Sequence, residues 1–438
     1  MKRAGRTFVI LAFSLSGPAH VQASSLIEAR SCTDLARPMT LEEARSEARA
    51  HAPETAELEA RVRGAEILLE DASRRLRHDP SLSIDFSPAS AAGTSAGYSA
   101  TVGARFPIDV SGSWSSRKGS AEADLERTRY DREDALRALD EAVDVAFAQL
   151  AAAQRAVTSA KRVSALFELA VDAERQRFEV GQGNRIDLDA AEIDAADARA
   201  GLEQARGAVE TTRVALARLM ACGLEPYLEV EDPDEPSNAP DENEPDAVIE
   251  RDPRVRAAEA EAHAMELAVR MNERLMWPVP TVGVDFITRR SDIPEGSFHG
   301  PSSAGLSAAW PEKEVVLSLG VPIPIFEGAR EPRAQARAAS LGASARVAIV
   351  RSNVRAELQQ AWAAYMAAAN AHRELVPTAA IISRDFELLG RAVESGAMDA
   401  VARGVALRRL EAATRRLDLA VLELRVARAS WLRQSRSR

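Results

Sequence analysis

The sequence predicts a mainly α-helical fold with a small β part, arranged as two tandem helix-strand-strand-helix-helix repeats. Three observations support this prediction. The 438 residues include 46% apolar and 28% charged residues but only 5% aromatics, a composition that suits long helices packed side by side better than several thick globular cores. The chain aligns with itself at an offset of 200 residues, and strictly alternating segments occupy equivalent places in both halves.

The first 23 residues have the organisation of a secretory signal peptide. Three basic residues precede a short apolar run, and Val21 and Ala23 stand at the −3 and −1 positions of a cleavage site. The run is too short to cross a membrane as a helix. Cleavage would change the formal net charge from −10 to −13, and a protein this acidic is not expected to bind nucleic acid. Residues 24–39 are expected to form an extended segment.

The chain has two cysteines, Cys32 and Cys222. Export to an oxidising compartment would allow a disulfide between them, and two unpaired buried thiols are the alternative. No zinc-type spacing is present and the six histidines are scattered, so we expect no metal site and no cofactor.

The internal repeat sets the domain boundaries. Pro53 aligns with Pro253, and the strand that follows Pro80 aligns with the one that follows Pro280. A period this long indicates duplication of a whole unit. The predicted parts are repeat 1 at 40–222, an acidic proline-rich linker at 223–248, and repeat 2 at 249–438. Each repeat is expected to open with a helix, over 40–77 and over 249–276.

Each repeat contains two strands with apolar and polar residues in strict alternation. They are expected at about 81–88 and 98–109 in repeat 1, and at about 281–289 and 314–326 in repeat 2. A half-buried sheet of a soluble protein is one interpretation. Strands of about ten residues with one apolar face also suit a membrane barrel. The residues then expected to face lipid are Leu82, Ile84, Phe86, Val102, Phe106, Val282, Val284, Phe286, Leu317 and Leu319.

A very long helix follows each second strand and then turns back. Residues 119–179 contain no proline and would extend ~90 Å as a helix. The corresponding helix of repeat 2, over 333–394, contains Pro377, which is expected to kink it. Lengths of this kind call for coiled-coil packing. The predicted hairpin tips are about 180–184, with Gly181 and Gly183, and about 395–398, with Gly396.

Four strands and six long helices in two tandem units, behind a signal peptide, resemble the TolC-like outer-membrane efflux protein family. The matching stretches are the strand-to-helix passages 106–123 and 321–339 and the hairpin tip 178–199. The opening of repeat 2 and its PIPIF segment are most similar to the heavy-metal, CzcC/CusC-like branch of that family.

The resemblance implies a homotrimer in the bacterial outer membrane, with a 12-stranded β-barrel and a long coiled-coil tunnel in the periplasm. It also implies a passive, non-enzymatic channel of a tripartite efflux or type I secretion system. Its partners would be a periplasmic adaptor (membrane fusion protein), an inner-membrane pump and outer-membrane lipid. The alternatives are a periplasmic adaptor and a secreted coiled-coil structural protein without channel activity.

The resemblance further implies a gate at the periplasmic tip, near the hairpin turns. Repeat 1 carries acidic residues after its tip, and repeat 2 carries basic ones, so salt bridges between the two hairpins could hold a gate closed. A solvated charged helix face is the alternative. The tip glycines Gly181, Gly183 and Gly396 are expected to dock the adaptor. The expected gate residues are Asp187, Asp189, Asp194, Arg403 and Arg408, with Arg409 beside them.

Overall fold

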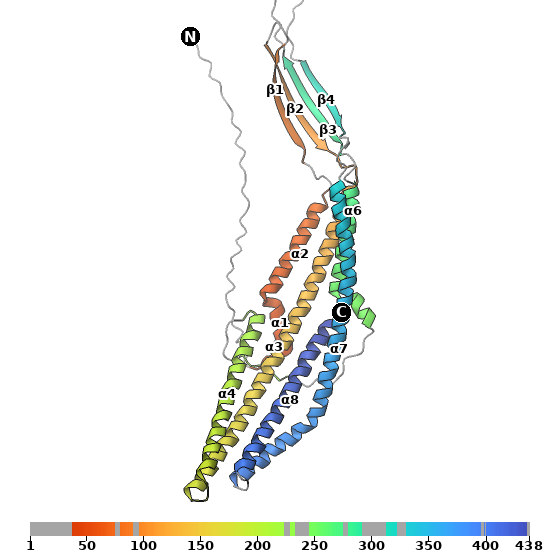
Figure 1. The fold of residues 1–438 in the computed structure, drawn as a ribbon. Coiled ribbons are helices and arrows are strands. Elements are labelled where there is room, and N and C mark those ends of the chain that lie inside the picture. Colours follow the sequence, from red (N-terminus) through yellow and green to blue (C-terminus); the bar gives the residue numbers. More distant parts are fainter. Residues whose placement is uncertain are drawn as a thin grey trace, which may run out of the picture.

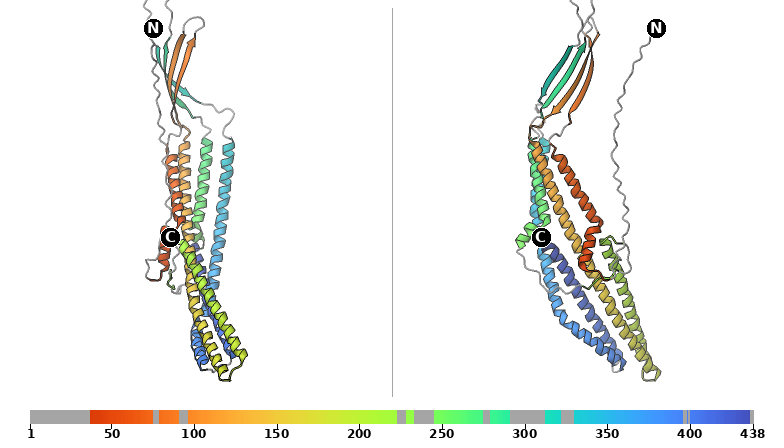
Figure 2. Two further views of the ribbon diagram at one scale, coloured as in Figure 1. Left: turned by 90° about the vertical axis from the view of Figure 1, so that its left-hand side faces the viewer. Right: turned by 180° about the vertical axis from the view of Figure 1, so that it is seen from behind.

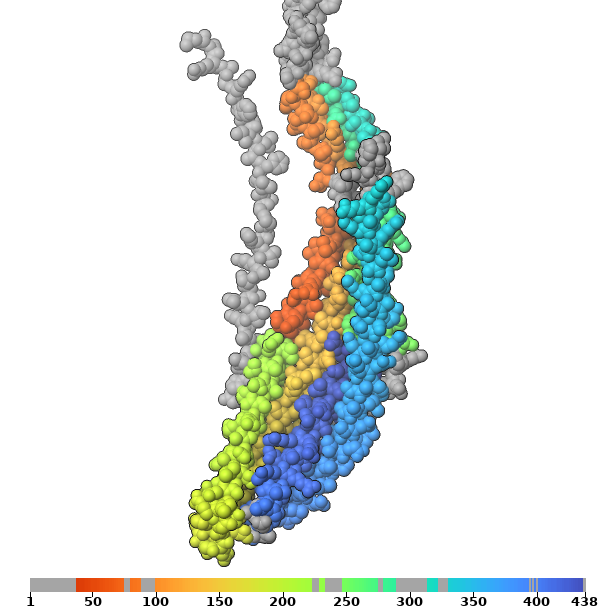
Figure 3. Space-filling view, viewed as in Figure 1, coloured from red at the N-terminus to blue at the C-terminus, as the bar shows by residue number. Residues whose placement is uncertain are grey.

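The computed structural model shows a long, thin molecule with a β-sheet at one end and two helical hairpin tips at the other (Figure 1). Figure 3 shows the same rod in a space-filling view. The structure describes residues 37–74, 79–90, 96–222, 228–232, 245–274, 279–290, 312–321, 330–395, 398 and 400–435.

Each repeat begins with two consecutive helices. Repeat 1 has α1 (Leu41–His51) and α2 (Pro53–Ala72), and repeat 2 has α5 (Pro245–Arg251) and α6 (Pro253–Arg274). A capping box between Thr40 and Glu43 starts α1. The sequence led us to expect one uninterrupted helix in each place. The breaks fall immediately before the aligned prolines Pro53 and Pro253, because proline disfavours the helical conformation in the residue before it and starts a new helix well.

The four strands form one antiparallel sheet in the order β1-β2-β3-β4. The strands are β1 (Ser81–Ser90), β2 (Ala96–Pro107), β3 (Thr281–Arg290) and β4 (Glu312–Gly320). The pairing of β2 with β3 joins the two repeats within this sheet. Among the described residues, β1 pairs only with β2 and β4 pairs only with β3, so both outer edges lack a partner strand.

The register places most of the large apolar residues of the four strands on one face. Leu82 lies opposite Ala104, Ala104 opposite Val284, and Val284 opposite Leu317. Phe86 and Leu317 are 75% and 77% exposed, although apolar side chains of this size are usually buried. Nine of the ten residues expected to face lipid are exposed on this face, and Val282 is half-buried.

The opposite face of the sheet is mainly polar, with Ile287 and Val316 as apolar exceptions, and it is crowded. An added Cβ at Gly103 would lie 2.0 Å from Oδ1 of Asp285, and one at Gly283 would lie 2.3 Å from Oγ of Ser318. These glycines therefore leave room for polar side chains of the neighbouring strands.

The long helices form the rest of the rod. They are α3 (Ser113–Glu179), α4 (Arg185–Leu219), α7 (Arg330–Glu394) and α8 (Ala400–Ser435). Helix α7 contains Pro377 and bends in its lower half (Figure 2). Within the described residues, no helix is both long and apolar enough to cross a membrane.

The apolar core is divided into small clusters along the rod. One includes Phe147, Leu150 and Met220 in repeat 1, and another includes Trp431 and Tyr365 in repeat 2. A third cluster near the tips combines side chains of α3, α4 and α8. The helical rod is too narrow to enclose one continuous apolar core. Polar contacts between the helices therefore help to fix how they are aligned.

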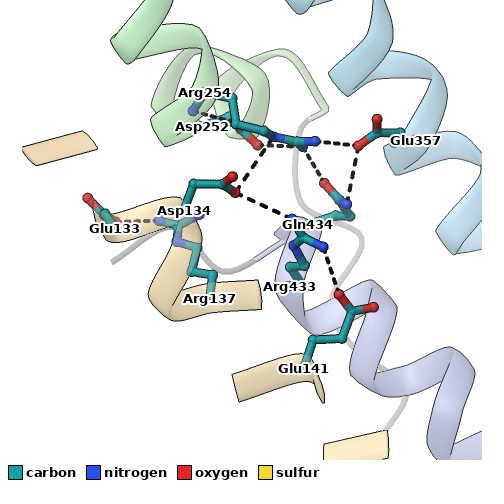
Figure 4. Close-up of polar contacts among 9 residues, drawn as sticks. All are labelled: Glu133, Asp134, Arg137, Glu141, Asp252, Arg254, Glu357, Arg433 and Gln434. Atoms are coloured by element: carbon teal, nitrogen blue, oxygen red, sulfur yellow. Dashed lines mark hydrogen bonds and ion pairs between the residues drawn. The ribbon is translucent and has the colours of Figure 1, made fainter. Parts of the chain in front are cut away.

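A polar network joins four helices midway along the rod (Figure 4). Arg254 of α6 donates to Glu357 of α7 and, over 2.7 Å, to Oε1 of Gln434 of α8. Burial alone would lower the pKa of Arg254, but its hydrogen bonds to Asp252 and Glu357 raise that pKa above its ordinary value. Arg433 of α8 completes the network, because it contacts Asp134 and Glu141 of α3.

Several predicted features lie outside the described residues. They are the signal peptide 1–23, Cys32 and the tip glycine Gly396. Cys222 is disulfide-bonded, and its pairing with Cys32 stays a prediction. The linker predicted at 223–248 is described only at 228–232 and from residue 245, where α5 begins.

Replacement of Gly103 by alanine tests the packing of the polar sheet face. The added methyl group would displace Asp285, so we expect a loss of ~1–3 kcal/mol, measured as a lower unfolding temperature of the purified protein. Gly64→Ala in α2 is the matched control, because no atom lies within 4 Å of an added Cβ there and alanine favours a helix. Equal unfolding temperatures for the two variants would contradict the crowded polar face.

Candidate functional site at the hairpin tips

The first hairpin turns through residues 180–184. Gly181 has a φ of +74°, a conformation that glycine adopts without strain. The N–H groups of Gln182 and Gly183 both donate to the carbonyl of Arg177, over 2.8 and 2.9 Å, in a glycine-containing helix C-cap. An added Cβ at Gly183 would lie 2.9 Å from the backbone N of Phe178. The turn itself therefore requires Gly183 to lack a side chain.

A buried ion pair joins the two hairpins just above the tips. Arg403 of α8 donates through Nη2 to Oε1 of Glu174 of α3. The two side chains are only 3% and 2% exposed. Arg177 approaches the same Glu174 oxygen at 3.5 Å. A buried carboxylate between two guanidinium groups is stable only while both the charge and the hydrogen bonds are matched.

A second, more exposed ion pair lies beside the first. Nη2 of Arg408 of α8 lies 3.0 Å from Oδ1 of Asp194 of α4. An added Cβ at Gly404 would lie 3.1 Å from Oδ2 of Asp194, so the glycine permits the carboxylate to approach α8 closely. Asp194 and Arg408, both expected gate residues, are thus paired with each other across the hairpins.

The other two expected acidic residues do not bridge the hairpins. Asp189 pairs with Arg185 of its own helix, with 2.8 Å between Nε and Oδ1. Asp187 forms no ion pair within the described part of the chain, and its N–H is capped by the Asn184 side chain over 2.9 Å. The expectation that Asp187 and Asp189 link the hairpins is therefore not met in this conformation.

Asp187 nevertheless lies close to the basic residues. A pocket of about 140 Å³ between α4 and α8 is lined by Asp187, Asp194, Arg403 and Arg408. Nη1 of Arg403 is buried and has no hydrogen-bond partner among the described residues. Four of the five expected gate residues therefore share one pocket. Charged groups of both signs there can join the hairpins or release them, and they suggest no bond-breaking chemistry.

Sequence reasoning missed Glu174, although a signal was present. Phe167, Ala170, Val171 and Glu174 follow helical spacing, and all four are buried on one stripe of α3. A carboxylate on an otherwise apolar stripe indicates a buried cationic partner, since an unpaired buried charge is costly. The sequence could not show that this partner is Arg403, 229 residues away.

A four-stranded sheet with an exposed apolar face, carried on two long helical hairpins, is the architecture that the resemblance to outer-membrane efflux proteins implies. The sequence model of the family described as outer membrane efflux protein matches residues 44–221, which is nearly all of repeat 1. The resemblance to TolC-like outer-membrane efflux proteins is confirmed. No curated protein matches the chain in sequence.

Several solved structures share the fold over nearly the whole chain. A membrane protein from Pseudomonas aeruginosa matches with a TM-score of 0.71 and 16% identity, over 90% of this chain and 93% of that one. The open state of the Neisseria gonorrhoeae MtrE outer membrane channel matches with 0.67 and 18%, over 90% and 88%. CusC matches with 0.68 and 15%, over 90% and 91%. Identities this low show a common fold and do not single out a branch.

Removal of one partner of the buried ion pair tests its contribution to the tip. We expect Glu174→Gln to destabilise the tip region by ~3–5 kcal/mol, because Arg403 is left as an uncompensated buried charge. The measurement is backbone hydrogen exchange of residues 165–180 and 400–412. The control is Asp189→Asn, which removes an exposed pair within one helix and should cost only ~0–1 kcal/mol. Similar exchange in both variants would contradict a dominant role for the buried pair.

Proposed function

We propose that this protein is the outer-membrane channel of a tripartite efflux or type I secretion system. In the proposal, three copies form a 12-stranded barrel and a helical tunnel through the periplasm. Substrate would pass through it passively, delivered by an inner-membrane pump and a periplasmic adaptor. The protein carries out no enzymatic reaction.

The observation that carries this proposal is a sheet whose two outer edges lack a partner strand among the described residues and whose apolar face is exposed. Unpaired N–H and C=O groups at a strand edge are very unfavourable in lipid, so a sheet in a membrane must close on itself. Four strands are too few to close around a conduit. Three copies would supply 12 strands, with the apolar side outward and the mainly polar side around the lumen.

The alternative functions account for less of the structure. A periplasmic adaptor or a secreted coiled-coil protein would also use long helical hairpins. Neither needs paired alternating strands at equivalent positions of both repeats, joined in one sheet through β2 and β3. A soluble sheet of this kind would also leave residues such as Phe86 and Leu317 in contact with water at a cost of ~1.5–3 kcal/mol each.

The tip residues supply the proposed gate and docking surface. In the closed state the Glu174–Arg403 and Asp194–Arg408 pairs hold the two hairpins of each protomer together, and threefold repetition multiplies their effect. Asp187 offers Arg403 a second carboxylate in the shared pocket. The turn around Gly181, with Gly396 at the second tip, is proposed to dock the adaptor, since space around Gly181 is open.

The function is tested with protein extracted from outer-membrane fractions and inserted into planar lipid bilayers. We expect a species three times the monomer mass that dissociates on heating, and discrete single-channel currents. A monomeric protein in the periplasmic or secreted fraction, with no current, would support one of the non-channel alternatives.

The same recordings test the gate. The combined change Asp187→Ala and Arg403→Ala should raise conductance or open time, because it removes the carboxylate and the guanidinium that share the pocket. Asp189→Ala serves as the control and should behave as the unaltered channel. Unchanged currents in the double variant would exclude the gate, while the channel itself would remain supported.

A further inference from the structure

Glycines on the mainly polar face of the sheet lie directly opposite polar residues of the neighbouring strand. The pairs are Gly103 of β2 with Asp285, Gly283 of β3 with Ser318, and Gly320 of β4 with Thr281. Glycine weakens the interior of a strand and often marks a place where another group approaches closely. The register therefore indicates that the polar side chains use the space that these glycines leave.

The carboxylate of Asp285 occupies the space above Gly103. An added Cβ at Gly103 would lie 2.0 Å from Oδ1 of Asp285 and 2.9 Å from Oγ of Ser83. The Cβ positions of directly opposite residues are ~4.5–5.5 Å apart, so the Asp285 carboxylate reaches more than half of the way to the next strand. Side chains of a sheet usually stand roughly perpendicular to it. Asp285 instead leans sideways along the sheet surface.

The same arrangement recurs at the other two glycines. Oγ of Ser318 lies 2.3 Å from the position of an added Cβ at Gly283, and Oγ1 of Thr281 lies 2.8 Å from that at Gly320. Gly283 also lies opposite Arg105 of β2, whose Cγ is 3.4 Å from the same added Cβ. Polar side chains of β2, β3 and β4 therefore lean over a glycine of an adjacent strand.

Asp85 lacks this arrangement. It aligns with Asp285 at the repeat offset of 200 residues, but its partner across the strands is Thr101. Asp85 is exposed, whereas Asp285 is half-buried. The placement of glycine thus distinguishes two aspartates that the sequence repeat makes equivalent.

We propose that Gly103, Gly283 and Gly320 are notches, positions in the wall where a polar side chain of the adjacent strand lies flat. The notches set the free width of the conduit and keep the Asp285 carboxylate away from its axis. The inference rests on the proposed channel, in which the mainly polar face lines the lumen. Threefold repetition would place three notches of each kind around the barrel. Upright side chains at these positions would narrow the conduit and bring three carboxylates closer to its cargo.

The width is measured with thiol reagents that enter from the end of the sheet away from the helices (Figure 1), so the hairpin tips do not limit the result. The reporter is Ser81→Cys, because Ser81 is exposed and lies one level closer to the helices than Ser83 and Gly103. A reagent must pass the level of Asp285 to reach it. Labelling rates in intact cells are compared for a small maleimide and a polymer-linked one.

Gly103→Ala should lower the rate of the large reagent relative to the small one by roughly threefold, because displaced carboxylates narrow one level of the proposed barrel. It should also favour a cationic reagent over an anionic one of equal size, and high salt should weaken that preference. Adding Asp285→Ala removes the displaced side chain and should restore both ratios. Ratios in Gly103→Ala equal to those of the unaltered background would overturn the notches, and so would a failure of the second change to restore them.

Gly320→Ala is the matched control. It makes the same replacement on the same face, but Gly320 pairs with Thr281, one level closer to the helices than the reporter. Reagents reach Ser81→Cys without passing that level, so both ratios should stay unchanged. An equal drop in Gly320→Ala would show a general distortion of the sheet and overturn the local effect of Gly103.

The labelling also separates the two proposals. If neither reagent labels Ser81→Cys in intact cells but both label the unfolded protein, the conduit is contradicted and the notches fall with it. If Ser81→Cys is labelled and the ratios do not respond to Gly103→Ala, the notches alone are contradicted and the channel remains supported.

Discussion

The unpaired edges of the sheet are the constraint on which the rest of the structure depends. Strands β1 and β4 each use only one side for hydrogen bonding within the described chain, and residues such as Phe86 present a large apolar surface to the outside. A single copy satisfies neither requirement. Association of copies edge to edge would satisfy both, since it pairs the backbone groups and leaves the apolar face for lipid.

The helices of each repeat also depend on contacts with the other repeat. Their cores are small, and much of the contact between the two repeats is made by charged side chains, at the Arg254 network and at the Glu174–Arg403 pair. Such contacts are specific in geometry and sensitive to the loss of one partner. In the proposed channel, loss of the pairs near the tips would let the hairpins separate at one end while the contacts farther up keep them aligned.

The sequence predicted the fold well and the site only in part. Alternation in the strands, the aligned prolines and the glycine at the first tip are local signals. Each determines a strand, a helix break or a turn through the backbone conformations that these residues favour. The partners of the charged residues near the tips depend on contacts between residues that are far apart in the sequence. Asp189 pairs with its own helix, whereas Arg403 finds Glu174 on another hairpin. Only the packing of α8 against α3 determines that choice, and helical periodicity carries no information about it.

Cross-linking between copies at the sheet edges measures the central claim most directly. Cysteines would be introduced singly along β1 and along β4, combined in pairs within one chain, and oxidised in outer-membrane preparations. The account predicts that register-matched pairs give a covalent ladder that ends at three copies. A ladder that ends at two copies, or no cross-linking at any register, would contradict closure of the sheet by three protomers.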